Sequence, residues 1–325
     1  MSLEVRNLTK RYGKKEVVSH ISFTMDKPGV FALLGTNGAG KTTSIRMILG
    51  MLAKDEGEVT WNGKPLDPLE INVGYLAEER GLYPKYALMD QMMYFAKLKN
   101  VDTETAKKRI AYWVKHLELQ EYFYPKPVGK RPAKPMKAEQ LSKGNQQKVQ
   151  LMAALISDPE LIVLDEPLSG LDPVNSDLFK EVIRNLIKQN KYVIMSSHQM
   201  EVIEEFCEDI IILHHGNSVV QGNLNEIKKS YGRVNVSVKC EGDIDKYIEE
   251  LGIKVMEKTP EGYLLKVTGD EMAENLLKNI MSAGIRVVRF EMREPSLHEI
   301  FVEKATSLDV DNTGAEAVSG GNNEE

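Results

Sequence analysis

A glycine-rich stretch near the N-terminus constrains this chain more than any other feature. It consists of the consecutive residues Gly35, Thr36, Asn37, Gly38, Ala39, Gly40, Lys41, Thr42 and Thr43. A glycine, four residues and then Gly-Lys-Thr form the phosphate-binding loop pattern, whose glycines let backbone N–H groups surround a phosphate chain. Lys41 supplies a charge for the β- and γ-phosphates, and the Thr42 hydroxyl can ligate Mg²⁺. The loop therefore predicts a nucleotide triphosphate and its metal ion as ligands.

The segments on either side of the loop have the order that the pattern requires. The apolar run at 30–34 is typical of a buried parallel strand. After the loop, Ile45, Ile48 and Leu52 follow one another at helical spacing. Strand, loop and helix in this order place phosphate at a helix N-terminus, where the helix dipole favours anions. The loop alone does not say which kind of nucleotide enzyme this is.

Composition is that of an ordinary globular protein, with 42% apolar and 28% charged residues among 325, enough for one large domain or two ordinary ones. The net charge of −6 gives no basic surface, so no nucleic-acid partner is expected. Cys207 and Cys240 have no CxxC spacing and are expected to be reduced thiols of a cytosolic protein. No apolar run approaches the ~18 residues that cross a bilayer, so any membrane role should come through a partner.

The rhythm of the predicted elements changes at about residue 230. Residues 2–25 alternate apolar and polar residues and are broken at 13–15, which predicts an antiparallel hairpin. Strands and helices then alternate, with helices expected from Thr43 and from about Asn145 and with helical spacing within about 85–157. Beyond residue 230 the order is strand, helix, strand, strand, helix, strand, which is a ferredoxin-like arrangement. We therefore expect a first domain at 1–230 that contains the glycine-rich loop, a small α+β accessory domain at 231–306 and a disordered acidic tail at 307–325. The accessory domain shows no catalytic set, and packing, dimerisation, regulation and ligand binding all remain open as its role.

Two adjacent carboxylates form a second candidate site. The apolar run at 161–164 ends in Asp165 and Glu166, and Pro167 follows. Since the carboxyl ends of strands in a doubly wound sheet face the ligand crevice, we predict that Asp165 holds Mg²⁺, directly or through water. Glu166 lies one residue further on, where it could polarise an attacking water as a general base. The alternative, a surface pair that begins a turn, is disfavoured by the unbroken apolar strand before it.

A third group of motifs indicates a family. Residues 141–147, Leu-Ser-Lys-Gly-Asn-Gln-Gln, resemble the LSGGQ signature of ABC ATPases, which other phosphate-loop enzymes lack. Residues 169–172 resemble the family's D-loop, and residues 196–198 resemble the segment that carries its switch histidine. The resemblance covers residues 2 to about 230. Residues 73–84, together with the C-terminal module, further resemble a bacterial export-type subgroup that is often labelled as sodium efflux of the NatA kind.

This resemblance implies a P-loop ATPase fold of ABC type, α/β with antiparallel β and α-helical subdomains, and a chain that binds and hydrolyses ATP with Mg²⁺. It also implies that two nucleotide-binding domains pack head to tail, so a homodimer is expected. Each ATP would lie between the phosphate loop of one copy and the signature of the other. The further partner is an integral-membrane permease, which would hold the chain in the cytoplasm at the inner face of the membrane. The subgroup favours export of an ion, drug, peptide or lipid.

The resemblance also implies individual roles. Lys41 and His198 would contact the γ-phosphate, Thr43 the α-phosphate and Tyr12 the adenine, while Glu166 would orient the water. Mg²⁺ would be held by Thr42 and Asp165. The ATP bound by one copy would also be contacted by the signature and D-loop of the other copy, through Ser142, Gly144 and Asp172.

Structural alternatives accompany several of these roles. Tyr12 could be a plain strand aromatic and His198 a core histidine. The signature and D-loop residues could serve only to cap helices: Ser142, Gly144 and Asp172.

Two departures from the family pattern affect the expected site. Where the wider family has a glutamine that touches the metal, this chain has Glu78, a carboxylate that adds negative charge and lacks the amide donor. Lys143 and Asn145 replace the Gly and Gln of the signature.

An alternative function is a soluble ABC-type ATPase that acts as a switch on DNA or the ribosome. The absence of sustained heptads between the two nucleotide motifs, and the presence of one set of motifs, disfavour it.

Overall fold

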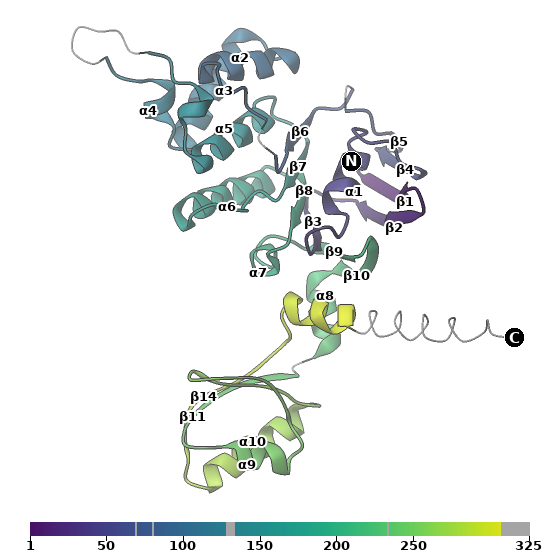
Figure 1. The fold of residues 1–325 in the computed structure, drawn as a ribbon, viewed down its shortest axis with the longest axis vertical. Helices are drawn as coiled ribbons and strands as arrows, with labels where there is room; N and C mark the ends of the chain where they lie inside the picture. Colours follow the sequence, from purple (N-terminus) through teal and green to yellow (C-terminus); the bar gives the residue numbers. More distant parts are fainter. Residues whose placement is uncertain (69, 80, 128–133, 233, 307–325) are drawn as a thin grey trace, which may run out of the picture. The chain divides into compact units, whose positions relative to one another are not determined.

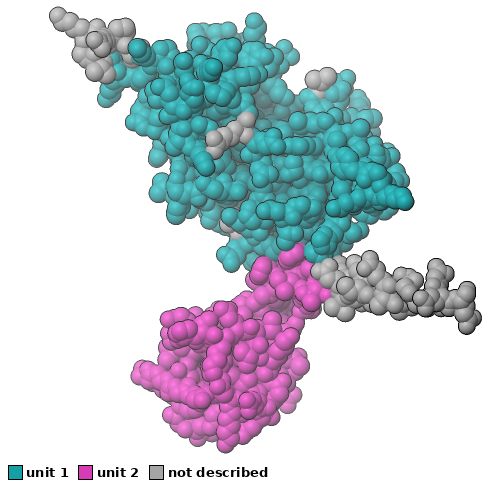
Figure 2. Space-filling model, viewed as in Figure 1, with its two compact units in different colours: residues 1–221 teal, residues 222–325 magenta. Residues whose placement is uncertain are grey.

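The computed structural model describes residues 1–68, 70–79, 81–127, 134–232 and 234–306 (Figure 1). The predicted tail at 307–325 lies outside the described residues. The chain divides into two compact units, residues 1–221 and 222–325 (Figure 2). The division falls earlier than the expected boundary at about residue 230, so that helix α8 (Leu224–Tyr231) belongs to the second unit. Asn223, the last residue of β10, also caps α8, so no long linker marks the division in the sequence.

An antiparallel sheet opens the first unit. The predicted hairpin is present, since β1 (Leu3–Tyr12) pairs with β2 (Lys15–Met25). On its other edge β1 pairs with β4 (Glu56–Trp61), and β5 (Lys64–Pro65) completes the order β2-β1-β4-β5.

A second, mostly parallel sheet forms the centre of the unit. Its order is β10-β9-β3-β8-β7-β6. The strands are β3 (Gly29–Gly35), β6 (Val73–Leu76), β7 (Leu161–Asp165), β8 (Tyr192–Ser197), β9 (Asp209–His214) and β10 (Asn217–Asn223). Strands β3 and β7 are buried along nearly their whole length and pair in parallel with β8, as their apolar runs predict. Their carboxyl ends therefore meet at one edge of the sheet, where Asp165 lies opposite Ser196.

The helices of the first unit fall into two groups. Figure 1 shows one group on the side of the parallel sheet away from the antiparallel sheet, and its members contact one another. They are α2 (Leu88–Leu98), α3 (Thr103–His116), α4 (Gln120–Phe123), η1 (Ala138–Gln140) and α5 (Lys143–Leu155). The remaining helices follow strands of the parallel sheet: α1 (Lys41–Ile48), α6 (Pro173–Lys188) and α7 (Met200–Ile203).

Two helices begin two residues earlier than their apolar spacing suggests. Helix α1 starts at Lys41 because Gly40, with a φ of 105°, forms its N-terminal boundary. Helix α5 starts at Lys143 because the Ser142 hydroxyl oxygen accepts a hydrogen bond from the Asn145 backbone N–H at 3.2 Å. In both cases the boundary is set by capping, which apolar spacing does not report.

The core of the first unit joins the two sheets around α1. The rings of Phe23 and Phe31 stack with centroids 4.1 Å apart, and Trp61 meets the edge of Tyr192 at 5.1 Å. These contacts link β2 to β3 and β4 to β8, so the antiparallel sheet fixes the position of the strand that leads into the glycine loop. Among the described residues, no helix is long and apolar enough to span a bilayer.

The second unit contains the predicted strand and helix order. Its elements are β11 (Asn235–Glu241), α9 (Asp245–Glu250), β12 (Lys254–Thr259), β13 (Gly262–Lys266), α10 (Asp270–Ser282) and β14 (Arg286–Arg293). The strands form an antiparallel sheet in the order β12-β13-β11-β14, as a ferredoxin-like arrangement requires. One face of this sheet packs on the two helices through a core that includes Val236, Val238 and Leu276.

We predict that Gly74→Ala destabilises the first unit. An added Cβ at Gly74 in β6 would lie 2.4 Å from the Ala154 carbonyl oxygen, which is backbone and cannot rotate away. Overpacking of this kind costs about 1–3 kcal/mol, to be measured as the loss in free energy of unfolding by urea denaturation. Gly81→Ala is the matched control, since its nearest new contact is 3.8 Å away. Equal losses in the two variants would contradict the steric explanation.

Candidate functional site

The glycine loop joins β3 to α1 and surrounds the N-terminus of that helix. Gly35 has a φ of 147° and Gly40 a φ of 105°, both in the region that favours glycine. A Cβ at Gly35 would lie 2.4 Å from the Leu213 carbonyl oxygen, and one at Gly40 would lie 2.8 Å from that of Val17. The loop can therefore hold this shape only with glycine at these two positions. The shape leaves the backbone N–H groups at the start of α1 available for an anion.

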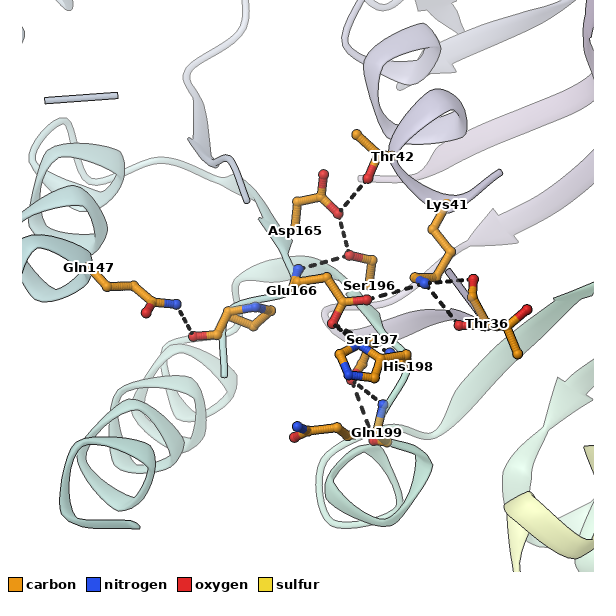
Figure 3. A network of polar contacts seen from close by, with 12 residues as sticks. Thr36, Lys41, Thr42, Gln147, Asp165, Glu166, Ser196, Ser197, His198 and Gln199 are labelled. Atoms are coloured by element: carbon orange, nitrogen blue, oxygen red, sulfur yellow. Dashed lines mark hydrogen bonds and ion pairs between the residues drawn. The ribbon is translucent and has the colours of Figure 1, made fainter. Parts of the chain in front are cut away.

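Lys41 lies within this loop with its ammonium group held at several points (Figure 3). Its Nζ donates to the carbonyl oxygens of Gly35 at 2.8 Å and Thr36 at 3.2 Å. The same Nζ lies 3.2 Å from Oε1 of Glu166, and both side chains are 6% exposed. A buried ammonium group fixed in this way is a preorganised partner for a phosphate group.

Asp165, at the end of β7, is buried among hydroxyl groups. Its Oδ1 accepts hydrogen bonds from Ser196 Oγ at 2.5 Å and from Thr42 Oγ1 at 3.3 Å (Figure 3). Its Oδ2 is buried and has no hydrogen-bond partner. Burial raises the pKa of the Asp165 carboxyl, because removing the ionised form from water is unfavourable.

These oxygen atoms fit a hard divalent cation. A carboxylate oxygen without a partner and a nearby threonine hydroxyl are the donors that Mg²⁺ takes in proteins. Among the described residues, no group of three or more His, Cys, Asp or Glu side chains is placed to hold a metal ion. The site therefore suits a cation that takes its remaining ligands from water and from a phosphate chain.

Glu166 connects Lys41 to the segment after β8. Its Oε2 lies 2.9 Å from His198 Nδ1 and accepts a longer bond, 3.4 Å, from the His198 backbone N–H. Its own backbone N–H donates to Ser196 Oγ at 2.9 Å. The φ of Glu166 is 50°, a left-handed conformation that costs a non-glycine residue about 1–3 kcal/mol. Backbone strain of this kind persists where the surrounding contacts impose it. Here the strained backbone places the Glu166 carboxylate beside the glycine loop.

A cavity of about 330 Å³ lies over the glycine loop. It brings together most of the residues proposed from sequence as ligands of the nucleotide and its metal. The lining residues are Tyr12, Val17, Asn37, Gly38, Gly40, Lys41, Thr42, Thr43, Glu78 and Glu166. Tyr12 is 56% exposed, so its ring is accessible to a flat ligand. Sequence reasoning missed Val17, which carries no motif of its own.

Ser196 is the second residue that sequence reasoning missed. It was noted only as part of the segment before His198, yet its hydroxyl donates to Asp165 and accepts from Glu166. A polar residue at the carboxyl end of an apolar strand next to β7 was the available signal.

The signature and D-loop residues lie elsewhere in the chain. Ser142, Gly144 and Asp172 are not among the residues that line the cavity. Ser142 caps α5, and Asp172 caps α6 by accepting from the Asn175 N–H at 3.0 Å. A Cβ at Gly144 would lie 2.9 Å from Asn175 Nδ2, so the two helix starts are in close contact.

One side-chain contact ties the signature helix to the segment after Glu166. Gln147 Nε2 donates to the Pro167 carbonyl oxygen at 2.8 Å (Figure 3). Of the two altered signature positions, Asn145 donates through Nδ2 to the Tyr122 hydroxyl oxygen at 2.9 Å.

Known proteins match both units. A family model described as ABC transporter matches residues 18–169, and one described as ATP-binding protein DrrA1-3-like, C-terminal domain, matches residues 222–305. The uncharacterized ABC transporter ATP-binding protein YhaQ of Bacillus subtilis is 40% identical over 307 residues, which are 94% of this chain and 99% of that protein.

Two further relatives come from the same organism. The linearmycin resistance ATP-binding protein LnrL is 29% identical over 92% of this chain and 97% of its own length. The ABC transporter ATP-binding protein NatA is 34% identical over 67% of this chain and 87% of its own length. The solved structure of an ATP-binding subunit of an ABC transporter is similar with a TM-score of 0.63 at 26% identity, over 71% of this chain and 94% of that one.

We predict that Asp165→Asn removes a pH-dependent loss of stability in metal-free buffer. Burial raises the pKa of Asp165 in the folded chain, so the folded state binds this proton more tightly than the unfolded state. The contribution of Asp165 to the free energy of unfolding is therefore fully present below the ordinary aspartate pKa of about 3.9. It is lost as pH rises through the higher pKa of the folded state. The amide carries no charge, and its oxygen can still accept from Ser196 and Thr42. Urea denaturation in EDTA at a series of pH values measures the difference.

Asp172→Asn is the matched control with the opposite sign. Hydrogen bonds from the Asn175 backbone N–H and then from its side-chain amide lower the pKa of the exposed Asp172 carboxyl. Its contribution is present above the unfolded pKa and is lost as pH falls through the lower folded-state value. If the Asp165 and Asp172 variants changed the pH profile in the same direction, burial would not be the cause at Asp165.

Proposed function

We propose that this chain, which belongs to the ABC transporter ATP-binding family, is the subunit that hydrolyses ATP to power a separate membrane permease. The family and the ABC-type fold predicted from sequence are confirmed by the family models, the relatives and the solved structure. Members of this family are ATPases that drive transport. The residue roles, the metal and the partners discussed below belong to the proposal.

The polar cluster between the glycine loop and β7 carries this proposal. We assign Lys41 and His198 to the γ-phosphate and Thr43 to the α-phosphate. In the structure the Lys41 ammonium contacts the carboxylate that is suited to act as general base. A γ-phosphate bound at the Lys41 ammonium would replace Glu166 as its partner. The Glu166 carboxylate would then be free to accept a proton from the attacking water.

The metal-binding part of the proposal rests on the unpaired oxygen of Asp165. Asp165 and Thr42 would hold Mg²⁺, with Glu78 on the wall of the same cavity. When bound there, Mg²⁺ would supply positive charge that offsets the negative charge of the phosphate chain during transfer. The buried hydroxyl of Ser196 orients Asp165 for this purpose by donating to the opposite oxygen of the carboxylate.

Pairing with a second copy is supported by the position of the signature. Ser142, Gly144 and Asp172 do not line the cavity of their own chain, and they cluster at the adjacent starts of α5 and α6. The N-termini of two helices and a serine hydroxyl are suited to bind a γ-phosphate presented by another molecule. We therefore propose a head-to-tail homodimer in which Tyr12 stacks on the adenine of its own ATP.

An integral-membrane permease is the proposed second partner, which would place the chain on the cytoplasmic face of the membrane. Export is supported by the relative named for linearmycin resistance, since resistance to a compound is consistent with its removal from the cell. The cargo is recognised by the permease, so the residues of this chain do not select it.

We predict that Glu166→Gln binds ATP but hydrolyses it about 10²–10⁴-fold more slowly, because a neutral amide cannot accept the proton from water. Phosphate release measures turnover, and light scattering in saturating Mg-ATP should show a dimer of the variant. Glu181→Gln, an exposed position on α6, is the control and should keep wild-type turnover. Retention of more than about a tenth of wild-type turnover by Glu166→Gln would sink its role as base. A strictly monomeric variant, alone and with permease, would sink the shared-site arrangement.

We predict that Glu78→Gln raises the Mg²⁺ concentration needed for half-maximal phosphate release by about fivefold, equivalent to ~1 kcal/mol of lost attraction between opposite charges. The same change should tighten metal-free ATP binding, because one carboxylate fewer repels the phosphates. Glu79→Gln is the control, since that side chain is 85% exposed and pairs with Arg46. An unchanged Mg²⁺ dependence in Glu78→Gln would show that the carboxylate does not act on the metal.

A further inference from the structure

The second unit contains a cavity to which the proposed function gives no role. Its volume is about 670 Å³, compared with about 330 Å³ for the cavity over the glycine loop. All of its lining residues belong to the second unit, which is magenta in Figure 2. A volume of this size lies within the range of about 300–1,000 Å³ that small-molecule sites occupy. The cavity is therefore large enough for a ligand of its own.

The cavity lies on the face of the sheet that α9 and α10 leave open. Side chains alternate between the two faces of a strand, and Val236 and Leu265 belong to the core between the sheet and those helices. Their neighbours Asn235 and Lys266 therefore lie on the opposite face, where both line the cavity. The helical residues 297–306 contribute the other wall. The cavity is a space between an open sheet face and one helix.

A polar cluster fixes the start of that helix to the sheet. Ser296 and Glu299 form a capping box, in which the Ser296 N–H donates to Glu299 Oε2 at 2.7 Å and the Glu299 N–H donates to Ser296 Oγ at 3.3 Å. Arg293, on β14, donates to both carboxylate oxygens of Glu299 at 2.8 and 3.0 Å. Asn235, which is 4% exposed, donates to Glu299 Oε2 at 3.0 Å. Both walls are thus held before a ligand arrives, which lowers the ordering cost of binding.

One row of side chains across this sheet face carries three positive charges. In register across β12, β13, β11 and β14, the row consists of Lys254, Lys266, Asn235 and Arg293. The Arg293 charge is neutralised by the capping carboxylate, and Lys266 forms an ion pair with Glu303. Lys254 makes no ion pair with any residue that the structure describes, although like charges directly opposite in a sheet are unfavourable. An exposed ammonium without a counter-charge therefore lines the cavity.

The cavity also has exposed apolar side chains. Met256 and Val302 both line it, and each is 46% exposed. Met256 lies at a register shift in β12, so it has no partner on β13. Binding sites typically combine an apolar wall with a few polar groups that fix the orientation of the ligand. An unpaired ammonium beside exposed apolar side chains suits a molecule that has an anionic group and an apolar body.

We propose that this cavity binds an anionic amphiphile, that is, a molecule with one carboxylate or phosphate group and an aliphatic body. The anionic group pairs with Lys254, and the aliphatic body packs on Met256 and Val302. The bound molecule connects β12 to the helical residues 297–306. Of the roles that the sequence leaves open for the accessory domain, this is ligand binding, and it does not depend on the proposed ATPase function.

The site can be tested on the full-length chain with sodium octanoate as the probe. Methionine methyl groups labelled with ¹³C are observed by NMR during titration at constant ionic strength. Octanamide, which has the same apolar body without the charge, and acetate, which has the charge without the body, are titrated in parallel. The Met256 signal should shift saturably with octanoate only. Met281, which is 63% exposed on α10 and does not line the cavity, is the internal control. No saturable shift of Met256, or equal binding of octanamide or acetate, overturns the site.

Variants separate the charge from the apolar wall. Lys254→Gln should weaken octanoate binding by about threefold to tenfold, whereas Lys254→Arg should retain it, because a guanidinium also pairs with a carboxylate. Val302→Thr should weaken binding by about threefold, since a hydroxyl replaces an apolar methyl group. Lys278→Gln, at a 70% exposed side chain on α10, is the control and should bind like wild type.

Phosphate release without octanoate should stay at the wild-type rate in all four variants. A folded, active variant that has lost octanoate binding is then distinguishable from a failure of the ATPase. Undiminished octanoate binding by Lys254→Gln overturns the proposal.

Vesicles distinguish a membrane lipid from a free small molecule as the source of the amphiphile. The full-length chain is floated with phosphatidylcholine vesicles that contain or lack phosphatidic acid. Recovery that requires phosphatidic acid, and that falls in Lys254→Gln but not in Lys278→Gln, identifies a lipid. Octanoate binding without recovery on either kind of vesicle identifies a free carboxylate. Absence of both octanoate binding and recovery dependent on phosphatidic acid overturns the proposal.

Discussion

The site depends on one buried carboxylate at the junction of three parallel strands. Asp165 ends β7, accepts from Ser196 on β8 and from Thr42 at the start of α1, and thereby links the segments that follow three strands. Its burial is unfavourable for an ionised group, and its second oxygen has no partner. Burial of such a group is unfavourable unless a partner stabilises its charge, and the rest of the site is arranged around it.

Strain and buried charge are concentrated around that carboxylate. Glu166 has a left-handed backbone, and its side chain joins a buried ammonium, Lys41, to a histidine on the next loop. The surrounding sheets supply the rigidity that maintains this geometry, through the stacked rings of Phe23 and Phe31 behind the loop strand. In the proposed mechanism, a nucleotide that pairs with Lys41 also changes the partners of Glu166, so nucleotide binding is coupled to the position of this carboxylate.

Much of the fold could be predicted because its signals are local. The apolar runs at 30–34 and 161–164, the hairpin at 2–25 and the ferredoxin-like order each follow from patterns within a few residues. Apolar spacing places the starts of α1 and α5 two residues too late, because capping sets these starts. Ser196 and Val17 were missed for a related reason, since neither belongs to a motif and each enters the site only through a neighbouring strand.

The sequence by itself determined the chemistry of this protein: a glycine loop that demands phosphate, two carboxylates after an apolar strand, and motifs that identify the family. These features depend on residue type and spacing, which can be read directly from the sequence. Tertiary structure alone decided which groups meet. It pairs Glu166 with both Lys41 and His198, brings Glu78 to the cavity wall, and leaves Ser142 and Gly144 outside it. Such contacts join segments that are distant in sequence, and they exist only once the sheet has brought its strand ends to one edge.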